Sequence, residues 1–185
     1  MALDKWMTPQ SASGKSFRFL AWGALCFLLA VVASAAAAGE TARYVDHGDQ
    51  TVTDTQTGLM WQRLDAYLDT GHWMNWYESF DYVDRLNREG FGGYSDWRLP
   101  TVRELRTLYE ADKTNGRQVG REMVIHMDPV FEPNGGGAHW SSESNGRFNA
   151  FGLVFNTGRR FSAPKNSKSR KSVRAVRNHM DPPQE

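Results

Sequence analysis

Residues 19–38 form an uncharged run, FLAWGALCFLLAVVASAAAA, that most limits what the chain can fold into. As a helix, this run would be about 30 Å long, which is enough to cross the hydrocarbon core of a bilayer. Lys5, Lys15 and Arg18 precede the run, and it ends in small residues with the pattern A-x-A. A basic start, an apolar centre and a small-residue exit are typical of a secretory signal peptide. The sequence therefore predicts export, with a globular part that begins near residue 39.

The leader before the apolar run is long for a signal peptide, so an uncleaved membrane anchor and a buried helix remain alternatives. Leu25 precedes Cys26 where a lipoprotein would have a small residue, which disfavours a lipid anchor. We expect a signal peptide or N-terminal membrane anchor at 1–38, one domain at 40–180 and a flexible tail at 181–185. The expected location is periplasmic or secreted, or else the inner membrane, held there by residues 19–38.

Cys26 is the only cysteine of the 185 residues. The chain after residue 39 therefore forms no disulfide and offers no thiolate for nucleophilic catalysis or for metal binding. Its length of about 147 residues suits one domain, which must be stabilised by a packed core instead of a covalent staple.

Short β-branched and aromatic segments, separated by Gly, Asp and Asn, indicate strands before and after a central region. The expected strands lie at residues 42–46, 51–53, 59–61, 140–142, 150–156, 159–163 and 172–177. The last of these segments alternates between apolar and polar residues, which is typical of a strand with one buried face.

Two capping boxes predict helices in the central region, one at Asn75 and Glu78 and the other at Thr101 and Glu104. Gly90 is expected to end the first helix. The apolar faces predicted for the two helices are Trp76, Phe80, Val83 and Leu86, and Val102, Leu105, Leu108 and Tyr109. Strands followed by two helices and further strands indicate an α+β fold with a small antiparallel sheet.

Four motifs resemble the Lcl C-terminal domain family, which is found in bacterial collagen-like adhesins. Residues 46–54 (DHGDQTVTD) and 57–62 (TGLMWQ) are similar to the opening motif of the family, and residues 93–101 (GYSDWRLPT), with Glu104-Leu105, to its central signature. Residues 140–142 (WSS) and 173–177 (VRAVR) resemble its last two motifs. Their order and spacing extend over nearly all of residues 43–178.

The resemblance implies a C-type-lectin-like fold, related to that of sulfatase-modifying enzymes. In such folds the first and last strands pair, and two helices flank a small antiparallel sheet. Family members often carry a cysteine in the first helix and another in the final strand. The corresponding positions here are Val83 and Ala175, so we expect two apolar side chains to fill the space of the missing pair.

Several local patterns could bind a ligand, and each also has a purely structural interpretation. Trp97 and Arg98 could bind a carboxylate or stack on a sugar, but a packed Trp and an internally paired Arg at a helix entry are favoured. Asp46, Asp49 and Asp54 could bind calcium, but their spacing fits no known calcium loop and turn chemistry explains them.

Other motifs give weaker signals. Glu132-Pro133-Asn134 matches a tripeptide with which sugar-binding lectins hold calcium, but its usual partner motif is absent from this sequence. The histidines are scattered without zinc-ligand spacing. Ser141, Ser142 and Glu143 lie near His139 in the sequence, but nothing in the sequence supports a catalytic triad of these residues. Neither a phosphate-binding loop nor a dinucleotide fingerprint is found in the sequence. No cofactor is therefore expected, with calcium as the alternative left open.

Charge is unevenly distributed along the chain. Residues 40–158 contain 18 acidic and 11 basic residues, whereas residues 159–185 contain 8 basic and 2 acidic ones. We expect the basic residues to lie on an exposed loop that binds sulfate or phosphate groups, a solvated strand-loop-strand being the alternative. The candidate ligand-binding residues are Arg159, Arg160, Lys165, Lys168, Arg170 and Lys171, and the basic count also includes Arg174 and Arg177.

The favoured hypothesis is an exported, non-catalytic binding or adhesion module of the bacterial envelope. Its expected partner is a glycan, another polyanion or an envelope protein, and membrane contact would occur only through an uncleaved leader. Nucleic acid is disfavoured by the export signal and by the acidic part of the chain. The alternatives are an enzyme on the sulfatase-modifying type of fold with an unrecognised site, and an assembly subunit of a surface appendage.

Overall fold

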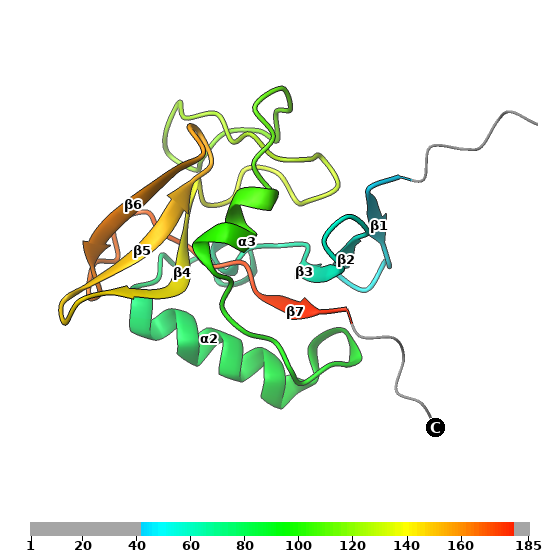
Figure 1. The fold of residues 1–185 in the computed structure, drawn as a ribbon, viewed down its shortest axis with the longest axis horizontal. Coiled ribbons are helices and arrows are strands. Elements are labelled where there is room, and N and C mark those ends of the chain that lie inside the picture. The colour runs from blue at the N-terminus through cyan, green and yellow to red at the C-terminus, as the bar shows by residue number, and fades with distance from the viewer. Residues whose placement is uncertain (1–41, 180–185) are drawn as a thin grey trace, which may run out of the picture. The chain divides into compact units, whose positions relative to one another are not determined.

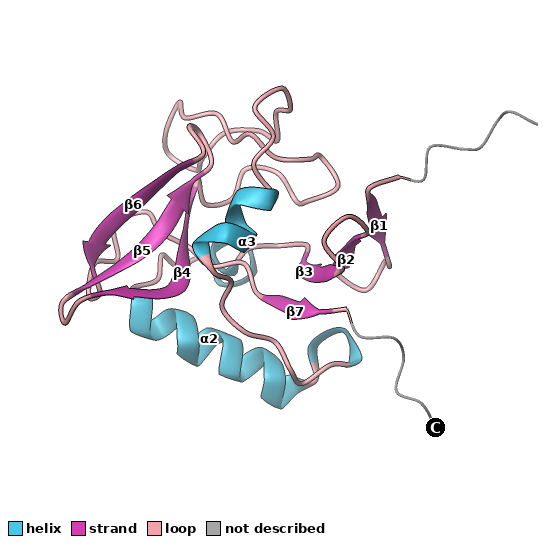
Figure 2. Ribbon diagram, viewed as in Figure 1, coloured by secondary structure: helices cyan, strands magenta, loops and turns pink. Residues whose placement is uncertain are grey.

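A computed structural model describes residues 42–179 of the protein, and the regions 1–38 and 181–185 discussed above lie outside the described residues. The described part is α+β, as predicted, with short helices and two small sheets (Figures 1 and 2). In chain order the elements are β1 (Tyr44–Asp46), β2 (Thr51–Asp54), β3 (Leu59–Gln62), α1 (Ala66–Thr70), α2 (Trp76–Glu89), the 3-10 turn η1 (Phe91–Gly93), α3 (Val102–Thr107), β4 (Ala138–Asn145), β5 (Asn149–Val154), β6 (Arg159–Pro164) and β7 (Val176–Asn178).

The strands form two antiparallel sheets instead of the single sheet that was predicted. The first sheet has the order β1-β2-β3-β7 and the second the order β4-β5-β6. The expected pairing of the first and last strands is wrong, because β1 pairs with β2 whereas β7 pairs with β3, with Val176 opposite Trp61. Two successive hairpins place β1, β2 and β3 side by side in this order. The last strand, β7, therefore pairs with the free edge of β3.

Helix α2 begins and ends as the sequence predicts. The side chain of Asn75 accepts a hydrogen bond from the backbone N–H of Glu78, the Glu78 carboxylate accepts one from the N–H of Asn75, and Gly90 ends the helix at a φ of 64°. The predicted apolar face is only partly correct. Val83 and Leu86 are buried together with Ser79 and Tyr82, whereas Phe80 is 38% exposed. The core-facing side of the helix is therefore rotated away from Phe80 and includes a polar residue.

Helix α3 lies between the two sheets in Figure 1 and packs against β4 and β5. It begins with the predicted capping box of Thr101 and Glu104, and Val102, Leu105 and Leu108 are buried. The short helix α1 was not predicted from the sequence. Asp65 caps its N-terminus and Gly71 follows its end, so local capping signals are present although the helix has only one buried residue, Ala66.

Two apolar clusters meet at the first sheet. Trp61 belongs to the cluster that extends to β5, and the adjacent Met60 belongs to the cluster beneath α2. Strand β3 is therefore buried on both faces, which explains why all four of its residues are inaccessible.

Residues 172–177 connect the two sheets. The amide of Ser172 donates to Ala138 O (2.9 Å) of the second sheet, and Val176 pairs with Trp61 of the first. All residues from 172 to 177 are buried. The predicted strand with one exposed face is therefore wrong over 172–175, because this segment passes between the two core clusters and has no solvent-facing side.

Val83 and Ala175 are 4% and 0% exposed. The resemblance implies that related proteins often carry a pair of cysteines at these positions. Both belong to the cluster beneath α2. The two apolar side chains therefore contribute to one part of the core, as expected.

Candidate functional site

The Trp97-Arg98 pattern has a structural role. Trp97 is buried and its Nε1 donates to Phe91 O (2.9 Å). Arg98 donates to both carboxylate oxygens of Glu104, at 2.6 and 2.9 Å, and these two contacts hold the pKa of Glu104 below its usual range against the opposing effect of burial. This pairing at the start of α3 is the internally satisfied arrangement favoured above.

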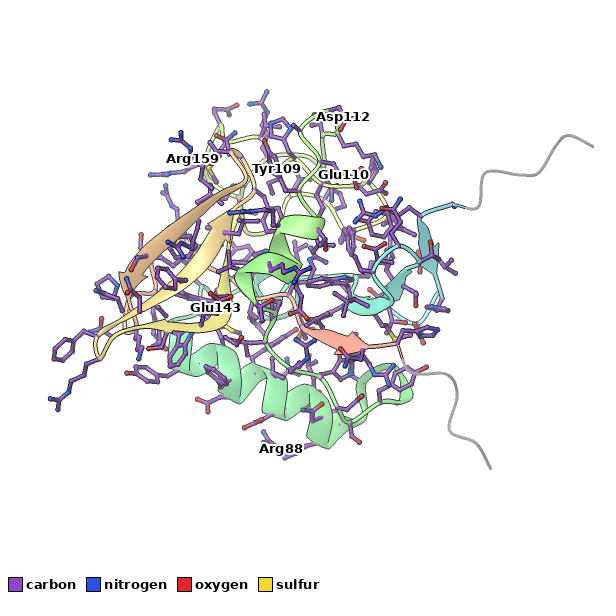
Figure 3. The ribbon with its side chains drawn as sticks, viewed as in Figure 1. Arg88, Tyr109, Glu110, Asp112, Glu143 and Arg159 are labelled. Atoms are coloured by element: carbon purple, nitrogen blue, oxygen red, sulfur yellow. The ribbon has the colours of Figure 1, made fainter. Side chains whose placement is uncertain are left out.

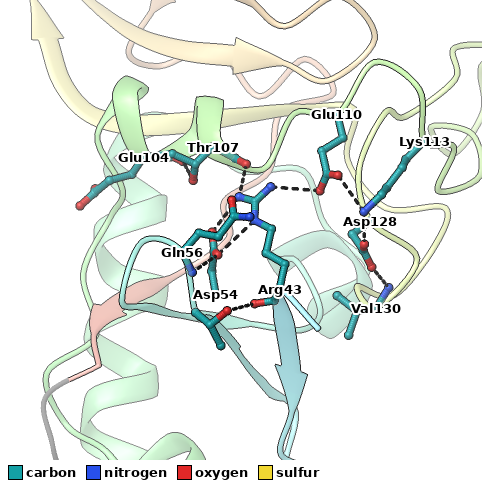
Figure 4. Close-up of polar contacts among 10 residues, drawn as sticks. Arg43, Asp54, Gln56, Glu104, Thr107, Glu110, Lys113, Asp128 and Val130 are labelled. Atoms are coloured by element: carbon teal, nitrogen blue, oxygen red, sulfur yellow. Dashed lines mark hydrogen bonds and ion pairs between the residues drawn. The ribbon is translucent and has the colours of Figure 1, made fainter. Parts of the chain in front are cut away.

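The three aspartates considered for calcium are engaged separately. Asp46 accepts from the backbone N–H of Gly48 and Asp49 from that of Thr51, both in the turn between β1 and β2. Asp54 is buried and pairs with Arg43, which also donates to the backbone oxygen of Thr107 in α3 and pairs with Glu110 of the following loop (Figure 4). Within residues 42–179 no three His, Asp or Glu side chains are grouped in a way that would hold a metal ion.

The tripeptide Glu132-Pro133-Asn134 is also occupied by local contacts. Glu132 pairs with Arg63 (3.1 Å), and Asn134 accepts from the backbone N–H of Arg117 (3.1 Å). Asn134 has a φ of 63°, a left-handed conformation that Asn tolerates better than most residues. Turn formation therefore accounts for these residues.

Asp65, His139 and Ser172 meet around Gly136 in the core. His139 Nε2 lies 3.2 Å from Asp65 Oδ2, and a Cβ placed on Gly136 would approach all three side chains. The residues are those of a catalytic triad, but each is completely buried. A catalytic residue must reach its substrate, so we assign this cluster to the core. Ser172 is therefore not the nucleophile that a catalytic role of His139 would require.

The charges of this buried cluster are balanced by Arg174. Burial lowers the pKa of His139 and keeps its imidazole neutral. Burial alone would raise the pKa of Asp65, but the hydrogen bond from His139, the Arg174 charge and the backbone N–H of Leu68 hold it below its usual range. Burial lowers the pKa of Arg174 to about 10, so the guanidinium stays charged and compensates the Asp65 carboxylate.

Two of the eight C-terminal basic residues are not on the surface. Arg174 is 2% exposed and donates to Gln62 O (2.7 Å), and Arg177 is 6% exposed and binds the Asp96 carboxylate through two nitrogens. Their inclusion in an exposed basic loop is therefore wrong, because residues 172–177 lie in the core. The six candidate ligand-binding residues lie outside this segment, on β6 and the loop that follows it.

These six residues define what we call the basic face: Arg159, Arg160, Lys165, Lys168, Arg170 and Lys171. Four of them are exposed, and Lys165 and Lys171 are half-buried. Figure 3 shows Arg159 at the upper end of the second sheet, where β6 begins, and Arg88 of α2 at the bottom of the view.

Most cations of the basic face have no carboxylate partner in the part of the chain that the structure describes. Lys168 is the exception and pairs with Glu78. Three others lie over aromatic rings: Arg160 over Phe151, Lys165 over Trp76, and Lys171 over Trp140 and Phe161. By contrast, three arginines of the acidic part, Arg43, Arg63 and Arg85, each contact two carboxylates.

A pocket of about 340 Å³ lies at the inner side of the basic face. Arg170 and Lys171 line it together with Arg121, which sequence analysis did not select. No acidic residue is among the lining residues, which are Gln118, Arg121, Met123, Ala138, Val154, Phe161, Ser162, Ala163, Ser169, Arg170 and Lys171. The pocket is therefore suited to an anion.

The sheet positions the aromatic side of this pocket through a glycine. Gly152 of β5 is paired with Trp140 on one side and Phe161 on the other, and a Cβ there would lie 2.4 Å from the Phe161 ring. With no side chain between them, the rings of Trp140 and Phe161 lie 5.3 Å apart. Lys171 Nζ is held near both rings by Ser167 Oγ (3.0 Å) and Ser169 O (3.1 Å). Burial lowers the pKa of Lys171.

Gln118 is the second residue of the pocket that sequence analysis missed. It is 3% exposed, and its Nε2 has no hydrogen-bond partner among the described residues. Gly137 gave a partial signal, because a Cβ there would lie 2.7 Å from Gln118 Oε1 and the sequence Gly135-Gly136-Gly137 indicates a close approach of the backbone. Nothing in the sequence indicates which side chain approaches this backbone.

The fold and the pocket define a small α+β domain with a basic, partly aromatic surface and no exposed catalytic constellation among the residues described. The family model for the Lcl C-terminal domain matches residues 50–177. The chain belongs to the Lcl C-terminal domain family. No curated protein matches the sequence. Within residues 42–179, no helix has the length and apolar character needed to cross a membrane, and the predicted leader lies outside that range.

Proposed function

We propose that the protein is an exported, non-catalytic binding module of the bacterial envelope, with a C-type-lectin-like domain whose ligand is an anionic glycan. The observation that carries this proposal is the basic face, where all but one of the six cations lack a carboxylate partner among the described residues. Unpaired cations on β6 and on the loop that follows it attract sulfate, phosphate or carboxylate groups. Three of them lie over aromatic rings, and the partly exposed rings of Phe151, Trp76 and Phe161 offer apolar surface to a sugar.

A binding role is favoured over catalysis because the best constellation of catalytic residue types, Asp65, His139 and Ser172, is completely buried. Export is supported by the uncharged run at 19–38 with its basic flank and small-residue end. An exported protein meets polysaccharides and envelope proteins, so the export signal disfavours nucleic acid as the polyanion.

The experiment is retention of the purified chain on immobilised heparin across a salt series. We expect retention at low salt that is lost as salt increases, because exposed charges are screened. Arg159→Glu should elute at clearly lower salt than the wild type. Arg88→Glu makes the same change of net charge at an exposed site of α2, at the bottom of the view in Figure 3, and it should elute close to the wild type.

Absence of retention at low salt would overturn the polyanion proposal. Equal shifts for Arg159→Glu and Arg88→Glu would show that net charge alone causes retention and would contradict a role for the basic face. Retention of the wild type by envelope extracts but not by heparin would instead indicate a protein partner.

A further inference from the structure

We infer that the pocket lined by Gln118, Arg121 and Lys171, at the inner side of the basic face, is a small-ligand site that binds one monosaccharide bearing a single anionic group. The choice of a sugar rests on the function proposed above, whereas the choice of an anion rests on the pocket itself. The remainder of the basic face would contact a glycan polymer along its surface. The pocket, by contrast, has the size and lining to enclose one sugar unit of such a polymer.

The charge of the pocket is positive and unbalanced. Arg121, Arg170 and Lys171 line it, no lining residue is acidic, and none of the three cations pairs with a carboxylate in the described part of the chain. Lys171 has two acceptors, Ser167 Oγ and Ser169 O, which leaves one of its three N–H groups for a ligand. A half-buried ammonium without a counter-ion is stabilised when an anion enters.

Gln118 supplies the second, independent observation. Its amide nitrogen is buried without a partner, although buried donors in folded proteins are nearly always hydrogen-bonded. Gln118 lines the pocket, so a rotation of its amide would bring this donor to a ligand acceptor, such as a sugar hydroxyl or carbonyl oxygen. An unsatisfied buried donor that lines a pocket is thus explained by binding better than by folding.

The remaining lining residues match a sugar ring in size and polarity. Phe161 and Met123 offer apolar surface to the C–H face of a pyranose, while Ser169 provides a hydroxyl group for its polar edge. A volume of about 340 Å³ is near the lower end of small-molecule sites, so it accommodates a monosaccharide and not a long oligosaccharide.

The backbone of the pocket rim is also unusual. Arg170 has a φ of 51°, a left-handed conformation that costs free energy in an arginine. Arg170→Gly relieves the strain and removes one cation, so it tests charge without damaging the fold.

The test is isothermal titration calorimetry of the full chain with three probes: glucuronate, glucose 6-sulfate and uncharged glucose. We expect binding of at least one anionic probe and at least tenfold weaker binding of glucose. The two anionic probes distinguish a carboxylate from a sulfate ligand. Arg170→Gly should weaken binding of the anionic probe about three- to tenfold while its melting temperature stays equal or rises.

Gln118→Met is the decisive variant, because it retains the shape of the side chain and removes the unpartnered donor. We expect about tenfold weaker binding of the anionic probe together with an unchanged or higher melting temperature. A lower melting temperature with unchanged binding would show that Gln118 is only structural and would overturn its assigned role. Arg88→Gly, at an exposed α2 position outside the pocket, serves as the matched charge control for Arg170→Gly and should bind the probe as the wild type does.

Failure of this inference is distinguishable from failure of the proposed function. If heparin retains the chain but neither anionic monosaccharide binds, the pocket site is wrong and the basic face still stands. If a monosaccharide binds but heparin does not retain the chain, the pocket stands and polyanion binding is wrong. Equal binding of glucose and glucuronate would overturn the assignment of an anionic ligand.

Discussion

At the scale of single residues, His139 couples the stability of the domain to pH. The folded protein keeps this imidazole neutral because burial lowers its pKa below the ordinary value of 6.5. Below pH 6.5 the unfolded chain therefore binds a proton that the folded chain does not, and the free energy of unfolding decreases as the pH falls. Asp65 adds a further loss of stability at lower pH, because its folded pKa lies below the ordinary 3.8 and folding favours its ionised form.

Urea unfolding measured between pH 7.5 and 5 checks this prediction. The wild type should lose stability over this range, and His139→Gln should show a shallower slope whatever its stability at pH 7.5. His72→Gln, at an exposed position, serves as the matched control for the loss of one histidine. An identical slope for His139→Gln and the wild type would contradict the assignment.

Arg174 is the residue whose loss should be most damaging. Its guanidinium donates to the backbone oxygens of Gln62 and Arg63 and compensates the buried Asp65 charge. Arg174→Met should therefore lower the free energy of unfolding by about 3–5 kcal/mol, the usual cost of leaving a buried charge unpaired. Arg103→Met, at an exposed position of α3, should change it by less than about 0.5 kcal/mol in the same denaturation experiment.

At the scale of elements, the capping box of α3 gives a direct test of a feature that is visible in the sequence. Thr101 Oγ1 accepts from the N–H of Glu104 (3.2 Å), so Thr101→Ala leaves that donor unsatisfied. We expect a loss of about 1 kcal/mol in thermal unfolding. Thr101→Ser keeps the hydroxyl and should recover most of this loss. Equal effects of Ala and Ser would mean that the methyl group of Thr101, and not the cap, stabilises the helix.

Elements defined by local signals could be predicted, and those defined by distant partners could not. The caps at Asn75 and Thr101 depend on residues three positions apart, so the sequence shows them directly. The exposure of Phe80 and the burial of residues 172–175 depend on which surfaces pack against them. Helical or strand periodicity does not contain that information.

Gly152 determines the packing of the second sheet. A Cβ at this position would lie 2.2 Å from the backbone oxygen of His139, which cannot move without breaking the pairing of β4 and β5. Gly152→Ala should lower the free energy of unfolding by about 1–3 kcal/mol. Ser144→Ala, in the exposed end of β4, should change it by less than about 0.5 kcal/mol. Chemical denaturation measures both, and equal values would contradict the close approach.

At the scale of the whole molecule, the candidate site shows why function is harder to predict than fold. The cations of the basic face are close in sequence and were found from charge alone. Gln118 and Arg121 come from the loop between α3 and β4, and they reach the pocket only because that loop packs beside β6. A pocket assembled from separate segments has no pattern of spacing that a single sequence could reveal.

The two sheets should unfold together, because residues 172–178 pair with both and one apolar cluster spans them. Val173, completely buried in this segment, offers the test. Hydrogen exchange measures the opening free energy of the most protected amides in each sheet. Val173→Ala should lower this free energy by about 2 kcal/mol in both sheets. Val45→Ala, at an exposed position of β1, should change neither sheet by more than about 0.5 kcal/mol. A loss confined to one sheet would show that the sheets are separate folding units and that residues 172–178 only connect them.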